Sequence, residues 1–499
     1  MKSWMKHICS AIAGVLLPGM VVASNPAYSM ESDAEVPVLQ EFRQLTSHQK
    51  FSRSQLIATI KLYDEHMRVQ ATGQYLDNVD THQLTQEATR SSIASTGVGL
   101  ISLALGDQLG VVENAAEKAH FTLLNLLNKD ATKPFQTPRS QSGWYKHFID
   151  AYTGTPSNAS KDVFSTIDTA ILGVAASMVE RYFETRAATD PFAAKAAALA
   201  NELVQGINWG QSLRFAPRPG MHQIFHGPQE GIEGRFWSLP FDEYVVLPCL
   251  GRAVETGQGR RGLASIFWDD HFADIDALPK AQYGDLSLLA VAGKNLTSHF
   301  THQFGFYFCG DLADDPVYRA ELDKLRQADQ QWFAEAGEGT FPKHWWGLGA
   351  GSELKFDLET GEIRYSGYGV AKIGKNPNLT FSPAIMAGFI PIENEGRVGS
   401  PLKGYSPIVA DLIKLHERNE CRYNFAGLDF LWRCTAKDPS LRVQHIEGVD
   451  LSTYMLGLAW FDPAIGKAFF DDYGVKARPN FPEATDLRVG LRAPSIANR

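Results

Sequence analysis

The segment Ser165–Phe183, "STIDTAILGVAASMVERYF", decides the fold class of this 499-residue chain. Its apolar residues recur at helical spacing and cover nearly the whole circumference, which predicts a helix buried on all sides. Ser165 and Thr166 precede the run as capping residues, and Asp168 lies in the first turn, where the helix dipole favours a negative charge. The segment therefore predicts a helix inside a large helical core.

Helical periodicity also dominates the rest of the chain, whereas strand signals are few. The segments 352–358 and 361–367, "SELKFDL" and "GEIRYSG", predict one hairpin around "ETG". We therefore expect an all-α fold, an (α/α)6 toroid with a small inserted β-hairpin, although periodicity alone fits an open helical solenoid equally well. The other segments with helical spacing are 54–67, 91–110, 111–128, 191–207, 242–257, 317–336, 400–417 and 450–461.

The N-terminus has the layout of a secretory signal peptide. Lys2 and Lys6 precede a short apolar run and then mostly small residues, and the run is too short to span a bilayer comfortably. We expect a periplasmic or secreted protein with no stable membrane insertion after signal removal; an uncleaved anchor is the alternative. The expected divisions are a signal peptide at 1–29, an extension at 30–52, the helical domain at 53–480 and a tail at 481–499.

The amino-acid composition limits the classes of ligand that the protein is expected to bind. The formal net charge is −9 and no basic run is present, so nucleic acids and other polyanions are poor candidates. A hydrophobic content of 44% and 10 tryptophans indicate a large core with aromatic surface left for a ligand, which fits a neutral polysaccharide or oligosaccharide.

The sequence offers no metal or cofactor motif. No CxxC pair, P-loop, HExxH or Rossmann fingerprint is present. His222 and His226 have a helical ligand spacing but lie in a segment rich in glycine and proline, which argues for a loop. We therefore expect no metal and no cofactor. In an oxidising compartment Cys421 and Cys434 are close enough in sequence to bridge, and four free buried thiols are the equally weighted alternative.

Acidic residues begin several of the apolar segments. Asp168, Asp242, Glu243 and Asp450 each lie where a helix starts, and capping alone explains any one of them. If these helices form an inner ring, however, their ends open into one cavity and the acids converge. Paired carboxylates suit glycoside hydrolysis, because one protonates the leaving oxygen and another activates water.

Aromatic and amide side chains near these acids are candidates for contacting sugar rings and hydroxyl groups. Core packing is the alternative for each of them. They are Trp237, Tyr244, His302, Gln303, Trp345, Trp346 and Tyr368.

The order of the motifs resembles a known group. The motifs "STGVGLISLALGDQLG", "GWYKHFID", "STIDTAILGVAASMVERYF", "INWG", "FDEYVVLPCLG", "THQFGFYF", "WWGLGAG", "FSPAIMAGFIP" and "GVDLSTYMLGL" follow one another over residues 54–470. In this order they are similar to the glucoamylase-like (α/α)6 group, which contains bacterial endo-β-1,2-glucanases and domains associated with cyclic β-1,2-glucan synthases. The segment 352–369 replaces a shorter loop of that group.

The resemblance implies hydrolysis of linear β-1,2-glucan to sophoro-oligosaccharides, with inversion and without a cofactor. It implies Glu243 as general acid and Asp450 as general base, with a substrate hydroxyl as a proton relay in some members. Asp168 matches a substrate-binding residue or an alternative base. The "HQ" and "WGL" motifs match residues that line the sugar sites, here His302, Gln303 and Trp346.

Three other activities remain open from the sequence. The first is a glycosidase or phosphorylase-like enzyme for another β-glucan. The second is a polysaccharide lyase, which the acidic charge disfavours because its uronic acid substrate is usually met by positive residues. The third is a periplasmic glycan-binding protein without catalysis, which needs the aromatic residues but not the acids.

Overall fold

The computed structural model describes residues 43–82, 89–130, 132, 134–157, 163–215, 219–222, 224–226, 236–238, 241–291, 296–356, 359–360, 362–393 and 404–477. The chain divides into two units, Met1–Gln44 and Leu45–Arg499, and the fold below is that of the second. Its first helix begins at Ser47, where Thr46 caps it, ahead of the domain start predicted at residue 53. The predicted signal peptide and C-terminal tail lie outside the described residues.

Six helices form a closed circuit of contacts in the described part of the chain. Each packs against the next one, and the last packs back against the first. The two longest are buried along nearly their whole length, as their all-round apolar sequences predict. The circuit comprises α4 (Ile93–Gln108), α6 (Thr166–Glu184), α8 (Val246–Gly257), α10 (Phe300–Phe308), α13 (Pro383–Gly388) and α15 (Gly448–Phe461).

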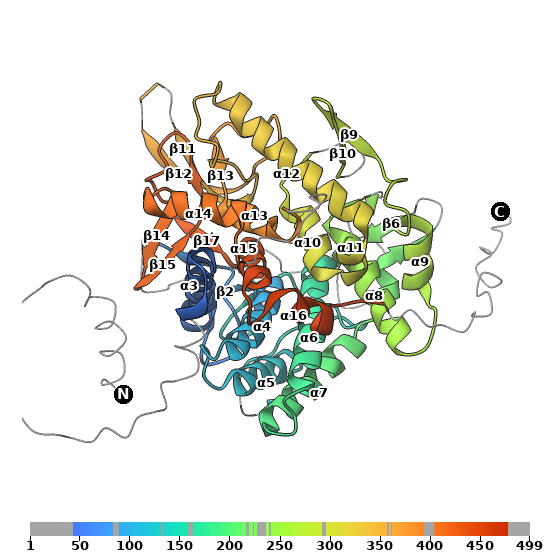
Figure 1. Cartoon of the computed structure of the whole chain (residues 1–499). Helices are drawn as coiled ribbons and strands as arrows, with labels where there is room; N and C mark the ends of the chain where they lie inside the picture. Colours follow the sequence, from blue (N-terminus) through green and yellow to red (C-terminus); the bar gives the residue numbers. More distant parts are fainter. Residues whose placement is uncertain are drawn as a thin grey trace, which may run out of the picture. The chain divides into compact units, whose positions relative to one another are not determined.

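A second set of helices surrounds this circuit (Figure 1). Each packs on an inner helix, except α12, which contacts the 3-10 turn η5 (Ile390–Ile392) that follows α13. The outer helices are α3 (Ser47–Lys61), α5 (Ala115–Leu126), α7 (Pro191–Gln205), α9 (Leu263–His271), α12 (Pro316–Ala336) and α14 (Pro407–Glu417). Shorter helical elements connect them: α11 (Gly310–Asp314), α16 (Gly466–Tyr473), the π-helix η1 (Leu62–Met67) and the 3-10 turns η3 (Trp209–Ser212) and η4 (Glu243–Val245).

Glycines allow the inner helices to approach closely. A Cβ at Gly97 of α4 would lie 2.8 Å from the Cα of Leu172 in α6. A Cβ at Gly457 of α15 would lie 2.1 Å from the carbonyl oxygen of Ala387 in α13. Both contacts are shorter than any side chain tolerates, so these two positions require glycine because of packing.

The structure contains more strand than the single predicted hairpin, which corrects the expectation of an all-α fold. Most strands span two to four residues, too few to show an alternating pattern in sequence. The described strands are β1 (Asn78–Asp80), β2 (Arg90–Ser92), β3 (Phe148–Asp150), β4 (Val163–Ser165), β5 (Leu213–Arg214), β6 (Gly220–His222), β7 (Ile224–His226), β8 (Phe236–Ser238), β9 (Lys280–Tyr283), β10 (Leu286–Leu289), β11 (Ala350–Phe356), β12 (Ile363–Val370), β13 (Thr380–Phe381), β14 (Arg422–Phe425), β15 (Leu428–Leu431), β16 (Cys434–Thr435) and β17 (His445–Glu447).

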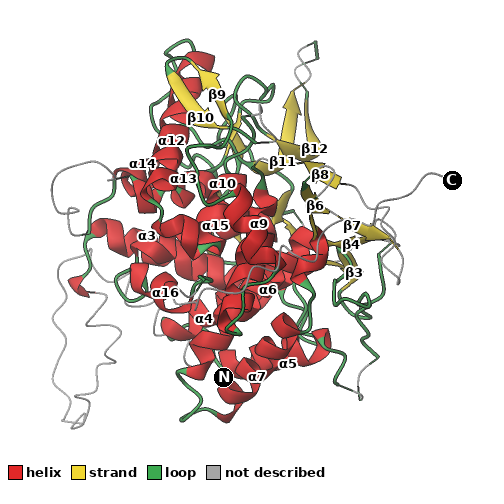
Figure 2. Ribbon diagram, turned by 90° about the vertical axis from the view of Figure 1, so that its right-hand side faces the viewer, coloured by secondary structure: helices red, strands yellow, loops and turns green. Residues whose placement is uncertain are grey.

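Several of these strands lead directly into inner helices. β2 runs into α4, β4 into α6 and β17 into α15. They pair with β3, β7 and β1 respectively, so their backbone hydrogen bonds hold the helix starts in place. Figure 2 shows β3, β4, β6, β7 and β8 together along one side of the helices, with β11 and β12 near them. The segments predicted as a hairpin are β11 and β12, which pair antiparallel.

Two disulfides link distant elements. Cys421 pairs with Cys434, one of the two alternatives left open by the sequence, and Cys249 of α8 pairs with Cys309 at the end of α10. The second pair had no signal in sequence, because 60 residues separate the two cysteines and only the contact between α8 and α10 brings them together. Within the described ranges, no helix combines the length and the apolar character needed to cross a membrane.

Candidate active site

Five residues singled out from the sequence line one cavity of about 1040 Å³. They are Asp168, Glu243, Tyr244, Tyr368 and Asp450. The three acids come from the starts of α6, η4 and α15, and the cavity is therefore surrounded by the N-terminal ends of inner helices. Convergence of these ends was the central expectation from the sequence.

Glu243 opens the 3-10 turn η4, which continues into α8. Removal from water raises the pKa of its carboxyl well above the usual value, and the charges of Asp242, Asp168 and Asp450 raise it further. The protonated form of this carboxyl is therefore favoured relative to that of an ordinary glutamate. Because η4 delays the start of α8 to Val246, Pro248 falls in the first turn of the α-helix, where a missing N–H costs little.

Asp450 lies in the first turn of α15 and is buried. The Tyr368 hydroxyl donates a hydrogen bond of 3.0 Å to its Oδ1. Burial raises the pKa of Asp450 to about 6, while the Arg433 charge and the Tyr368 hydrogen bond oppose the rise. Above that pH it is a carboxylate able to accept a proton.

Asp168 lies in the first turn of α6 and is held by two neighbours. The Ser165 hydroxyl donates to its Oδ2, and His147 Nε2 lies 3.5 Å from its Oδ1. Ser165 also caps the helix by accepting the Asp168 backbone N–H. Asp168 thus faces the cavity in an orientation that these two side chains determine.

Glu447, which sequence reasoning missed, lies three residues before Asp450 and lines the same cavity. Its Oε1 accepts hydrogen bonds from the backbone N–H and the hydroxyl of Ser352. Burial and the Asp450 charge raise the pKa of Glu447 to about 8, while Ser352 and Arg433 lower it. The criterion that selected the other acids, a position at the start of a helix, also applies to Glu447, because this residue directly precedes the helix that begins at Gly448.

A second missed group lines the same cavity, around the starts of β2 and β3. His147 stacks on Phe148 with ring centroids 3.7 Å apart, and the Arg90 guanidinium lies 4.7 Å above the same ring. Arg90 also pairs with Asp77 at 2.7 Å. The motif "GWYKHFID" contained His147 and Phe148, but only the pairing of β2 with β3 brings them beside Arg90.

The structure corrects the prediction that His302, Gln303 and Trp346 contact sugar. All three side chains are fully buried and are not among the residues that line the cavity. The His302 Nε2–H donates to the Leu289 carbonyl, and burial lowers the pKa of its imidazole to about 3. The Gln303 amide donates to the Ile385 carbonyl at 2.8 Å. These residues therefore pack in the core between inner helices and strands, which was the alternative to contact with sugar.

Two of the three remaining candidate residues also lie outside the cavity lining. Trp345 is outside the cavity lining: it stacks on Phe381 and donates its indole N–H to Glu420. Asp242 is buried away from the cavity lining; burial raises its pKa to about 7, and the backbone N–H groups of Tyr244 and Glu243 lower it. Trp237 belongs to β8, and its side chain lies outside the described part of the structure.

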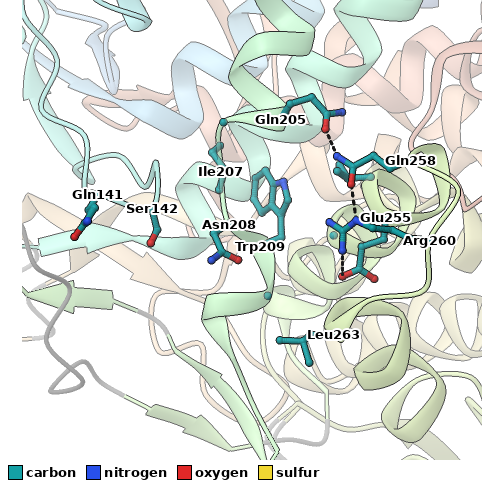
Figure 3. Close-up of a pocket in the computed structure, with 14 residues that line it drawn as sticks. Gln141, Ser142, Gln205, Ile207, Asn208, Trp209, Glu255, Gln258, Arg260 and Leu263 are labelled. Atoms are coloured by element: carbon teal, nitrogen blue, oxygen red, sulfur yellow. Dashed lines mark hydrogen bonds and ion pairs between the residues drawn. The ribbon is translucent and has the colours of Figure 1, made fainter. Parts of the chain in front are cut away.

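A separate cavity of about 580 Å³ lies near the C-terminal ends of α7 and α8 (Figure 3). A chain of three interactions runs along it. The Gln258 amide donates to Gln205, the Arg260 guanidinium donates to Gln258, and Arg260 also pairs with Glu255. Glu255 is the only carboxylate among its described lining residues, and it accepts N–H groups at the start of α9. This cavity therefore lacks a carboxylate pair.

The two histidines with a helical ligand spacing in the sequence belong to strands. His222 lies on β6 and His226 on β7, so their spacing is not that of two ligands on one helix. The one group of metal-binding residue types in the described residues, Cys249, Cys309 and Asp311, contains the two cysteines of a disulfide.

No family profile and no curated protein matches the sequence. Solved structures, by contrast, match most of the chain. A putative glucoamylase from Bacteroides caccae superposes with a TM-score of 0.64 at 15% identity, over 86% of this chain and 97% of that one. An endo-beta-1,2-glucanase from Chitinophaga pinensis, in complex with sophorotriose and glucose, gives 0.64 at 12% identity, over 86% and 95%.

A mutant endo-beta-1,2-glucanase from Talaromyces funiculosus, solved with beta-1,2-glucan, gives a TM-score of 0.56 at 11% identity, over 87% of this chain and 91% of that one. At such identities the similarity concerns the path of the backbone. The chain therefore has the glucoamylase-like fold that putative glucoamylases and endo-beta-1,2-glucanases share.

Proposed function

We propose that this protein is an exported, endo-acting glycoside hydrolase that cleaves linear β-1,2-glucan to sophoro-oligosaccharides with inversion. One observation carries the proposal: Glu243 and Asp450, far apart in the chain, line one cavity, and the pKa of Glu243 is raised well above its usual value while that of Asp450 rises to about 6. A protonated acid and an ionised base are the two groups that such hydrolysis needs. The circuit of six inner helices within an outer set supports an (α/α)6 toroid.

The proposed reaction uses the residues already described. Glu243 transfers its proton to the glycosidic oxygen as the C–O bond breaks, and the shortened chain leaves as an alcohol. Asp450 accepts a proton from the water that attacks C1 from the opposite face, so the new reducing end has the α configuration. The Tyr368 hydroxyl orients Asp450, and Asp168 offers a carboxylate to sugar hydroxyl groups.

Export rests on separate support. The sequence begins with the pattern of a secretory leader, and the fold is bridged by two disulfides, which persist in oxidising compartments.

Incubation with linear β-1,2-, β-1,3- and β-1,4-glucans tests the activity. We expect new reducing ends only from the β-1,2-glucan, with short sophoro-oligosaccharides as products and an α-anomer seen first by NMR. Release from a different glucan would reassign the linkage. Binding of glucan without release from any of them would favour the non-catalytic alternative.

The pH profile of kcat/KM follows from the two pKa shifts. Activity requires Asp450 ionised, so it rises with pH through a midpoint near the pKa of about 6. It requires Glu243 protonated, so it falls again as the pH rises through the raised pKa of that carboxyl, well above the ordinary glutamate value. Initial rates between pH 4 and 10 measure both limbs. An acidic midpoint near the ordinary aspartate pKa of about 4 would contradict the environment assigned to Asp450.

A further inference from the structure

Exposed apolar side chains concentrate on one strand of the molecule. Of the seven large hydrophobic residues that are exposed in the described part of the chain, four lie on β12. They are Ile363, Tyr365, Tyr368 and Val370. Such a local cluster marks a binding surface, because isolated exposed apolar residues are otherwise scattered.

A β-bulge places the two tyrosines on the same face of the hairpin. Tyr365 pairs with Leu354 and Tyr368 pairs with Ser352, two positions apart on β11, with a register shift between them. Without the bulge, residues three apart would point to opposite faces. Gly367 lies within this shifted stretch of β12, where a Cβ would meet no atom within 4 Å.

The two tyrosines border two neighbouring cavities. Tyr368 lines the cavity that contains Glu243 and Asp450. Tyr365 lines a cavity of about 390 Å³, together with His82, Leu354, Ile363, Ser440, Leu441 and Arg442. Two strand positions correspond to about 7 Å, so the second cavity adjoins the first along the hairpin.

Tyr365 is held in place while half of it stays accessible. Its hydroxyl and His82 Nε2 are 2.8 Å apart, and the two rings meet edge to face with centroids 5.0 Å apart. His82 closely follows β1, which pairs with the strand that leads into the Asp450 helix. The tyrosine ring is nevertheless 51% exposed. A fixed, accessible aromatic face is suited to stacking against a sugar ring.

We propose that the Tyr365–His82 cavity is a distal subsite for the same glucan chain whose bond lies between Glu243 and Asp450. The proposal rests on the proposed function. The lining is apolar and aromatic with a single cation, Arg442, which fits a neutral chain. Because this cavity is filled only by substrates that extend beyond the catalytic cavity, it makes the enzyme prefer long chains.

The test compares Tyr365→Ala with the matched variant Tyr405→Ala. Tyr405 is also an exposed tyrosine packed on a histidine, His48 at 4.6 Å, but it lies before α14. On long linear β-1,2-glucan, Tyr365→Ala is expected to lower kcat/KM about fivefold, the loss of one aromatic stacking contact. On the shortest oligosaccharide that is cleaved, it leaves kcat/KM unchanged. Tyr365→Phe, which keeps the ring, retains most of the long-chain rate.

A binding measurement separates this proposal from the proposed function. In native gels containing β-1,2-glucan, Glu243→Gln protein should be retarded, and adding Tyr365→Ala but not Tyr405→Ala should reduce the retardation. Equal retardation of both double variants, or equal loss of kcat/KM on short and long chains, would overturn the subsite. If the wild type hydrolyses no glucan, the proposed function fails, and the gel alone decides whether Tyr365 binds the chain.

Discussion

Replacing Glu243 by glutamine lowers kcat on linear β-1,2-glucan about 10³-fold, the size of a general acid contribution. Glutamine has nearly the same shape but no proton of suitable acidity to give to the leaving oxygen. The carboxyl is suited to this role because removal from water and three neighbouring acids raise its pKa well above the usual value. Reducing-end release at several glucan concentrations separates kcat from KM, and KM is expected to change little.

Two experiments distinguish loss of the acid from loss of the fold. A β-sophorosyl fluoride needs no protonation to leave, so Glu243→Gln should hydrolyse it at a rate much closer to that of the wild type. Glu180→Gln is the matched control: Glu180 is a half-buried glutamate on α6, and burial also raises its pKa, to about 7. It lines a different cavity and should keep full activity. An active Glu243→Gln enzyme would remove Glu243 from the mechanism.

Replacing Asp450 by asparagine lowers kcat at least about 10²-fold, because no group then accepts the proton of the attacking water. The asparagine oxygen still accepts the Tyr368 hydrogen bond, so the local geometry is preserved. The rising limb of the pH profile near pH 6 should disappear along with most of the rate.

Asp168→Asn is the comparison that identifies the base. Asp168 lines the same cavity and was the alternative base in the sequence interpretation. Added azide, an anion that needs no deprotonation, should restore turnover in Asp450→Asn and give an α-glycosyl azide, whereas Asp168→Asn should not respond. Azide rescue confined to Asp168→Asn would transfer the role of base to that residue.

The positions of the helices and their burial could be predicted from the local spacing of apolar residues in the sequence. The segments that became α4, α6 and α15 are apolar on every side, and burial on every side is the only environment that such a surface favours. The placement of Asp168, Glu243 and Asp450 at helix starts was equally local.

Contacts between segments that lie far apart in the chain could not be predicted from the sequence. His302 and Trp346 have the composition of sugar-binding residues, yet the packing of α10 and the following strands encloses them completely. Sequence offers no measure of which side of a helix meets a neighbour when all sides are apolar. Separation along the chain hid the Cys249–Cys309 disulfide and the pair of Arg90 with Phe148, which only contacts between distant elements bring together.

By itself, the sequence determined that strongly apolar helices exist and that three of them begin near an acid, because helical period and capping depend on residues within a few positions. Only the tertiary structure decided that Glu243 and Asp450 share a cavity, and that Asp242, next to one of them, does not line it. It also decided that the pKa values of both acids are raised, since burial and neighbouring charges are set by segments far away in the chain.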